Sequence, residues 1–242
     1  MFALLAALML VFAACGGDDD DDAGDSGSES DSDTTEPADE GGGGEALKVA
    51  FVYVGPIGDA GWTKKHDDGR KELEEALGDK VETTYLENIP EGAESEATFE
   101  DLGRDGYDLV FATSFGYGDP IQKVAPNYPD TVFMHATGYM VGDNIGTYFG
   151  AAEEARYLTG IAAGEATQNG QIGYVAAFPI PEVLRGINAF TLGVRSVNPE
   201  ATVQVVWTST WFGPDTEKQA AESLTDAGVD VLAMHQDSPA TG

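Results

Sequence analysis

The amino-acid sequence predicts an α/β fold made of two lobes, each of them a doubly wound parallel sheet covered by helices. The first observation is that short apolar runs alternate with segments of helical spacing from Lys48 onward. The second is that this alternation comes in two series, which divide near residue 169. Alternating strands and helices are typical of parallel sheets joined by right-handed crossovers. We therefore expect an N-terminal lobe over residues 47–168 and a second lobe over residues 169–242.

The first lobe opens with a strand of the fully buried type. KVAFVYV at 48–54 is a continuous β-branched and aromatic run, as expected for a strand covered on both faces. A helix over 60–77 follows, with Trp62, His66 and Leu73 at helical spacing. The other expected strands of this lobe are 81–86, 108–114, 131–136 and 145–149, and the other expected helices are 93–103, 118–126 and 150–168.

The second lobe repeats the pattern with fewer elements. The expected strands are 171–178, 201–208 and 230–236, and the expected helices are 181–197 and 214–227. Three strands and two helices are poor cover for a parallel sheet, because both of its faces need helices. We therefore expect this lobe to be incomplete and the sequence to be truncated.

The N-terminal segment has the pattern of a lipoprotein signal peptide over residues 1–15. FALLAALMLVFAA at 2–14 is an apolar run of 13 residues, too short to span a bilayer but suited to a signal peptide. Ala13 and Ala14 precede Cys15, the one cysteine of the chain, as in a lipobox. Cys15 is therefore the expected lipidation site, although no Lys or Arg precedes it and a short buried helix is the alternative.

Residues 16–46 are expected to form an acidic disordered tether. They hold 13 acids and no base, and they contain almost nothing apolar. The rest of the chain holds 30 acids against 12 Lys and Arg, within a formal net charge of −31. So acidic a surface repels phosphate backbones, which excludes nucleic acid as a partner. The Asp-rich stretch lacks the spacing of a calcium-binding loop.

The candidate ligand site lies where the strands end. In open parallel sheets, ligands bind beyond the carboxyl ends of the strands. Aromatic residues follow four of the strands, and flat walls of this kind suit a small molecule such as a nucleobase. The expected ligand-binding residues are Asp59, Trp62, Phe115, Gly116, Phe178, Trp211 and Asp237. Each aromatic has a core-packing alternative, and Asp59 has the alternative role of helix cap.

Motifs of the common enzyme classes are missing from the sequence. The glycines after the first strand have GxxGxxG spacing, which fails the dinucleotide fingerprint, and the GGGG at 41–44 is not followed by GK[ST]. No GxSxG or HExxH occurs, and the three histidines lack metal-ligand spacing. His66 is expected to be a hydrogen-bonded core residue. His135 closes a strand and could be either a core residue or a residue of the ligand site. We expect no enzyme activity, no cofactor and no metal.

Several phrases in the same order closely resemble the basic membrane protein family, the PnrA-like substrate-binding lipoproteins of ABC importers. These phrases are GPIGDAGWTKKHDDGRKELEEAL at 55–77, FATSFGY at 111–117, AAFPIPEVLRGINAFTLGVRSVNP at 176–199, VVWTSTWFGP at 205–214 and HQDSPA at 235–240. The resemblance implies a type I periplasmic-binding fold, with two lobes joined by a hinge. It also implies a purine nucleoside or purine base as ligand and an ABC permease as partner. Family chains continue well beyond HQDSPA, which adds to the expectation of truncation.

The expected function is therefore that of an extracytoplasmic, lipid-anchored receptor that hands a purine to a permease in the cell membrane. One alternative is a ligand-sensing receptor domain of the same fold. Another is a nucleoside-processing enzyme, for which Asp59, Asp119 and Asp237 would have to cluster.

Overall fold

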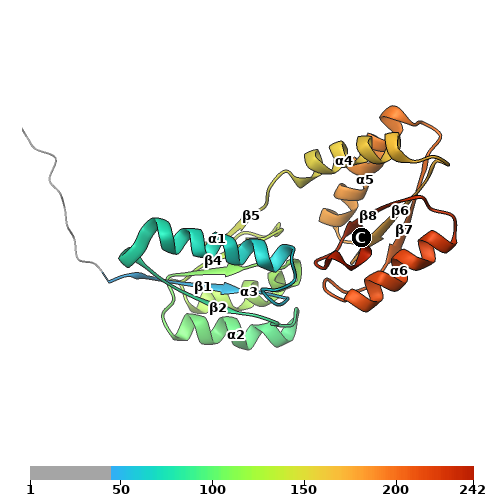
Figure 1. Cartoon of the computed structure of the whole chain (residues 1–242). Coiled ribbons are helices and arrows are strands. Elements are labelled where there is room, and N and C mark those ends of the chain that lie inside the picture. Colours follow the sequence, from blue (N-terminus) through green and yellow to red (C-terminus); the bar gives the residue numbers. More distant parts are fainter. Residues whose placement is uncertain (1–44) are drawn as a thin grey trace, which may run out of the picture. The chain divides into compact units, whose positions relative to one another are not determined.

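A computed structural model describes residues 45–242, which form two parallel sheets with helices on both faces of each (Figure 1). The expected signal peptide with Cys15, and the tether up to residue 44, lie outside the described residues. Among the residues described, no helix is both long enough and apolar enough to cross a membrane.

The first sheet has five parallel strands in the order β2-β1-β3-β4-β5. The order places β1 beside β3, where the winding direction of the chain reverses. This is the position at which open α/β sheets bind ligands. The strands are β1 (Leu47–Val52), β2 (Val81–Leu86), β3 (Leu109–Ala112), β4 (Val132–Ala136) and β5 (Ile145–Tyr148).

The helices of the first lobe cover the two opposite faces of β1. Val49 and Phe51 pack on the face covered by Leu73 of α1, whereas Ala50 and Val52 pack on the face covered by α2 and α3. Both faces of β1 are thus buried, as its continuous apolar run predicts. The helices are α1 (Trp62–Leu77), α2 (Ala93–Arg104) and α3 (Gly118–Val124).

The second sheet has three described strands in the order β7-β6-β8, all parallel. Helices α4 and α5 lie on one face, and α6 lies on the other. The strands are β6 (Gln171–Ala176), β7 (Thr202–Trp207) and β8 (Val231–His235), and the helices are α4 (Ala152–Ala166), α5 (Pro181–Val197) and α6 (Pro214–Asp226).

Helix α4 packs in the second lobe, which differs from the expected boundary at residue 169. Ala163 of α4 belongs to the same buried cluster as Ile172 of β6 and Phe190 of α5. Gly160 explains the closeness of the two helices, because a Cβ on it would lie 2.0 Å from the Phe190 carbonyl oxygen. The chain therefore leaves the first lobe after β5, before α4 begins.

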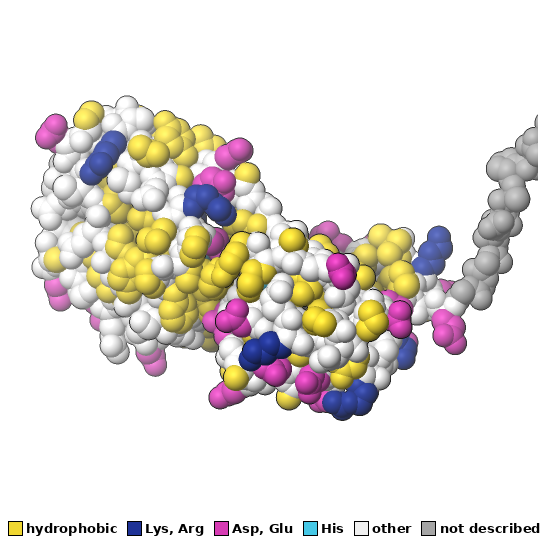
Figure 2. All heavy atoms as spheres, turned by 180° about the vertical axis from the view of Figure 1, so that it is seen from behind, with side chains coloured by type: hydrophobic (Ala, Val, Ile, Leu, Met, Phe, Trp, Pro, Cys, Tyr) yellow, Lys and Arg dark blue, Asp and Glu magenta, His cyan; other side chains and the backbone are white. Residues whose placement is uncertain are grey.

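The acidic character of the sequence appears on the surface. Figure 2 shows Asp and Glu side chains spread over the visible face of the described residues, with fewer Lys and Arg among them. Several Lys and Arg side chains pair with acids on the same helix, such as Arg104 with Asp101 and Lys64 with Asp68. The surface acids are too many for such pairs to neutralise.

Candidate functional site

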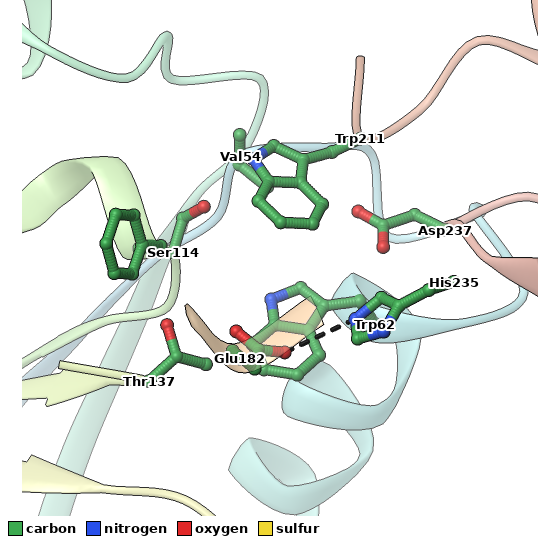
Figure 3. Close-up of a pocket in the computed structure, with 9 residues that line it drawn as sticks. Val54, Trp62, Ser114, Thr137, Glu182, Trp211, His235 and Asp237 are labelled. Carbon is green, nitrogen blue, oxygen red and sulfur yellow. Dashed lines mark ion pairs between the residues drawn. The ribbon is translucent and has the colours of Figure 1, made fainter. Parts of the chain in front are cut away.

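A cavity with about 280 Å³ of empty space lies at the carboxyl ends of strands from both sheets (Figure 3). Its walls come from the segments that follow β1, β3, β4, β7 and β8 and from the start of α5. The lining residues are Val54, Trp62, Ser114, Phe115, Thr137, Glu182, Trp211, His235 and Asp237.

Two indole rings form opposite sides of this cavity. Figure 3 shows Trp211 on one side and Trp62 on the other, with open space between them. The Trp62 indole N–H donates to the Thr113 carbonyl oxygen at 2.6 Å, and the Trp211 indole N–H donates to Glu91 Oε2 at 3.0 Å. Because both N–H groups have protein acceptors, the rings are held in orientation and offer the ligand only their apolar surfaces.

Each indole has an aromatic support behind it. The ring centroids of Trp62 and His66 lie 4.6 Å apart. Those of Trp211 and Phe178 lie 5.1 Å apart, at an interplanar angle of 62°. Such tilted and edge-on contacts stabilise aromatic pairs beyond the area that they bury. These contacts therefore help to hold the Trp62 and Trp211 rings in place on either side of the cavity.

Asp237 has a side chain without a partner in the site. Its side chain is 7% exposed, and it forms no hydrogen bond within the described part of the chain. Burial raises the pKa of this carboxyl to about 8, and the nearby carboxyl groups of Asp59, Glu217, Glu182 and Glu91 add to the rise. At neutral pH, Asp237 therefore carries a proton and faces the cavity as a neutral acid.

Glu182 and His235 add a second polar pair to the lining. His235 Nε2 lies 3.3 Å from Glu182 Oε1, while the buried His235 Nδ1 has no partner among the described residues. Glu182 lies in the first turn of α5, where the helix dipole favours a negative charge. No Lys or Arg side chain is among the lining residues of this cavity.

Asp59 lies beside the cavity and caps a helix. It is 1% exposed, and its carboxylate accepts the backbone N–H groups of Gly61, Thr63 and Lys64 at 2.7–2.9 Å. These bonds occupy both carboxylate oxygens and fix the start of α1, where Trp62 stands. The structure therefore gives Asp59 the capping arrangement and leaves it out of the cavity lining, which differs from the ligand contact that we expected.

The other expected contacts divide between the cavity and its surroundings. Phe115 lines the cavity, whereas Gly116 donates its N–H to Glu91 Oε1 at 2.7 Å behind it. Phe178 lines a neighbouring hollow and contributes by supporting Trp211. Trp62, Phe115, Trp211 and Asp237 are thus brought together, and the remaining expected residues are not.

The histidines away from the cavity hold the backbone around it. His66 Nδ1 lies 2.9 Å from the Trp62 carbonyl oxygen, and burial lowers the pKa of His66. Buried His135 donates from Nε2 to the carbonyl oxygens of Ser114 and Phe115, at 2.8 and 3.2 Å. His135 therefore positions the segment that carries Phe115, and it does not line the cavity.

Asp59, Asp119 and Asp237 do not come together in the lining of the cavity. Asp119 is exposed on α3 and is no part of the cavity, and Asp59 is occupied by backbone N–H groups. Within residues 45–242, no group of three or more His, Cys, Asp or Glu could hold a metal ion.

Six residues of the site were missed in the sequence. Five of them line the cavity, namely Val54, Ser114, Thr137, Glu182 and His235, and the sixth, Glu91, holds Trp211. His235 stands two residues before Asp237 in a strand end that the sequence indicated. Glu182 and Glu91 gave no comparable signal, because an acid in a first helical turn and an acid in a loop are both common on a surface.

A protein-family model described as ABC transporter substrate-binding protein, PnrA-like, matches residues 46–242. A purine-binding protein of Brucella abortus is 52% identical over 196 residues, which cover 81% of this chain and 56% of that protein. A Haloferax volcanii protein, whose name assigns it to glucose binding in an ABC transporter, is 52% identical over 197 residues, or 81% of this chain and 50% of that protein. The chain spans about half the length of these two relatives.

Solved structures share the fold. An ABC transporter solute-binding protein from Aeropyrum pernix K1 superposes with a TM-score of 0.70 at 26% identity, over 78% of this chain and 54% of that one. A second, from Conexibacter woesei, has a TM-score of 0.61 at 22% identity, over 81% of this chain and 66% of that one. The α/β fold with parallel sheets is thus that of periplasmic-binding-protein-like solute receptors.

Proposed function

The chain belongs to the family of PnrA-like ABC transporter substrate-binding proteins, and from this premise we propose that it captures a purine, with the base between Trp62 and Trp211 and its edge against Asp237. The family is one of solute-binding proteins rather than enzymes. The observation that carries the proposal is the pair of oriented indole rings with an unpartnered carboxyl group between them.

The indole walls favour a flat aromatic ligand. A base that enters the gap between Trp62 and Trp211 would stack on both rings without competing for their N–H groups, which already have acceptors. Stacking of a base on an aromatic side chain contributes about 1–3 kcal/mol. Two such contacts make up a large share of the roughly 8 kcal/mol that micromolar binding requires.

The protonated form of Asp237 favours an adenine-type edge. A neutral carboxylic acid offers one O–H donor and one carbonyl acceptor. Adenine presents the N7 acceptor beside the N6 amino donor, so both bonds can form at this edge, whereas the N7 and O6 at the same edge of guanine are both acceptors and only its O6 and N1–H edge could form both bonds. Because burial and neighbouring carboxyl groups raise the pKa of Asp237 to about 8, it keeps this donor at neutral pH.

The Haloferax relative raises glucose as the second ligand to test. A hexose would need several hydrogen bonds to its hydroxyl groups. The Ser114 hydroxyl is engaged, donating to Glu91 Oε1 at 2.6 Å, whereas Thr137 Oγ1 and His235 Nδ1 have no partner among the described residues. The two oriented indole rings are what favours the purine, and the test includes glucose as a competitor.

Delivery to a membrane permease completes the proposed role. Substrate-binding proteins of ABC transporters are extracytoplasmic and pass their ligand to a permease. The lipobox pattern that ends at Cys15 supports anchoring of this protein in the cell membrane through lipid. Residues 16–46 would then serve as the tether between the anchor and the lobes.

Titration calorimetry of the purified protein with adenine, adenosine, guanine and glucose tests the proposal. Adenine or adenosine should bind, guanine should bind more weakly, and the ligand should be recovered chemically unchanged. Trp62→Ala and Trp211→Ala should each weaken binding by about 5- to 150-fold, the equivalent of one lost stacking contact.

Trp207→Ala is the matched control, because Trp207 ends β7 and does not line the cavity. Its affinity should equal that of the wild type, with folding of all variants checked by circular dichroism. Binding of glucose without binding of any purine would contradict the proposed purine ligand and indicate a sugar ligand instead. A new product after long incubation would mean turnover and would contradict the receptor role.

A further inference from the structure

Glu91 joins the two walls of the cavity without lining it. It lies in the loop between β2 and α2, and its two carboxylate oxygens are both occupied. Oε2 accepts the Trp211 indole N–H at 3.0 Å, and Oε1 accepts the Ser114 hydroxyl at 2.6 Å and the Gly116 N–H at 2.7 Å. One side chain therefore contacts the loops that carry Trp211 and Phe115.

Three donors that meet on one side chain require a carboxylate. An ionised carboxyl group has two oxygens and only accepts, whereas an amide has one accepting oxygen and an NH₂ group that donates. A glutamine at this position could keep Ser114 and Gly116, but it would place its NH₂ group against the Trp211 N–H. The hydrogen-bonding pattern is thus specific to the acid.

The surroundings of Glu91 connect it to the cavity. Glu91 is one of the carboxyl groups that raise the pKa of Asp237, so the two side chains lie near each other. The backbone around Glu91 is also fitted to it, because a Cβ on Gly116 would lie 2.6 Å from Glu91 Cδ. The loop after β3 therefore leaves room for this side chain.

We propose that Glu91 is the positioning residue of the ligand site, which holds the Trp211 ring over the cavity and fixes the Phe115 segment opposite it. This inference rests on the proposed function, because it assigns Glu91 a role in binding at the same cavity. Hydrogen bonds to charged groups are among the stronger ones in proteins. Loss of the bond to Trp211 should free the ring to leave its stacking position.

The test compares Glu91→Gln with Glu87→Gln in the full chain. Glu87 lies nearby in the same loop and accepts the Ile57 N–H at 3.0 Å, so its variant makes the same charge change away from Trp211. The first readout is the indole N–H signals of the three tryptophans in ¹⁵N NMR, assigned by single Trp→Phe variants. Trp62 serves as the internal reference, because its N–H donates to Thr113.

In Glu91→Gln, the Trp211 signal should move toward the position of a free indole and exchange faster with water, while the Trp62 signal stays in place. Adenine should dissociate about ten times faster, with little change in its association rate. In a Trp211→Phe background, which lacks the indole donor, Glu91→Gln should have no further effect on dissociation. Glu87→Gln should match the wild type in every measurement.

An unchanged Trp211 signal in Glu91→Gln, or the same acceleration in Glu87→Gln, would overturn the proposal. The NMR readout needs no ligand, so it decides the role of Glu91 even if the wild type binds no purine. Failure of wild-type binding would count against the proposed function alone.

Discussion

At the residue scale, two aspartates of the same site have opposite environments. Asp59 accepts three backbone N–H groups, whereas Asp237 has no partner and lies among other carboxyl groups. Hydrogen bonds stabilise an ionised carboxylate, and burial beside like charges destabilises it. Asp59 therefore builds the helix that carries Trp62, while Asp237 keeps its hydrogen-bonding capacity for a ligand.

Asp237 should make the stability of the protein depend on pH. Its pKa is about 8 in the folded state against an ordinary value of 3.8, so the folded state binds more protons between these values. The free energy of unfolding therefore falls as pH rises through this window, by at most about 1.4 kcal/mol per pH unit. Asp237→Asn lacks this contribution and should exceed the wild type in stability by a few kcal/mol above pH 8.

Urea unfolding at pH 5, 7 and 8.5 measures this difference. The difference should shrink as pH falls toward 4, because Asp237 then begins to be protonated in the unfolded state as well as in the folded state. A constant difference between them at all three pH values would contradict the assignment of the proton to Asp237.

The sequence predicted the aromatic half of the site better than the acidic half. Trp62, Phe115 and Trp211 could be identified because each follows a parallel strand, and ligands bind beyond the carboxyl ends of such strands. Glu91 and Glu182 could not, since acids are abundant along this chain and only the fold decides which of them turn inward. Their partners are distant in sequence, as the bond from Trp211 to Glu91 illustrates.

At the element scale, the strands and helices were predictable, but the lobe to which α4 belongs was not. Periodicity gives the apolar side of a helix without naming the sheet that will bury it. Glycines settle the question in the structure: a Cβ on Gly160 would lie 2.0 Å from the Phe190 carbonyl oxygen, and one on Gly193 would lie 2.1 Å from the Tyr157 carbonyl oxygen. The two helices α4 and α5 therefore interlock backbone against backbone.

Gly160→Ala should destabilise the protein by about 1–3 kcal/mol, because the added methyl group must push α4 away from α5. Gly69→Ala is the matched control on α1, where a Cβ would meet nothing within 4 Å. It should be neutral or stabilise by up to about 1 kcal/mol through helix propensity. Urea unfolding of both variants checks this, and equal effects would contradict the interlocked packing.

At the scale of the whole molecule, the chain combines a membrane-directed N-terminal pattern with two strongly acidic lobes. The net charge of −31 disfavours close approach to other acidic surfaces, so attachment to the membrane would need a covalent anchor. Electrostatic attraction to anionic lipids requires basic segments, and residues 1–46 contain no Lys or Arg.

Cys15→Ser should therefore release the protein from the membrane. The wild type should partition into the detergent phase of a Triton X-114 extract and carry a mass increase on Cys15, whereas the variant should partition into the aqueous phase. Ser26→Ala, in the acidic segment that follows Cys15, is the control and should behave as the wild type. Retention of Cys15→Ser in the detergent phase would contradict the lipid anchor.

Under the proposed function, the acidic lining of the cavity also limits which chemical form of a purine the protein can bind. Glu182 lines the cavity and no Lys or Arg is among the residues that line it, so a phosphate group would meet a carboxylate and no cationic lining residue. We therefore expect that the protein does not bind extracellular nucleotides while they carry their phosphate groups. They become cargo only after hydrolysis of the phosphate ester, which places this receptor downstream of a phosphatase-type reaction outside the cytoplasm.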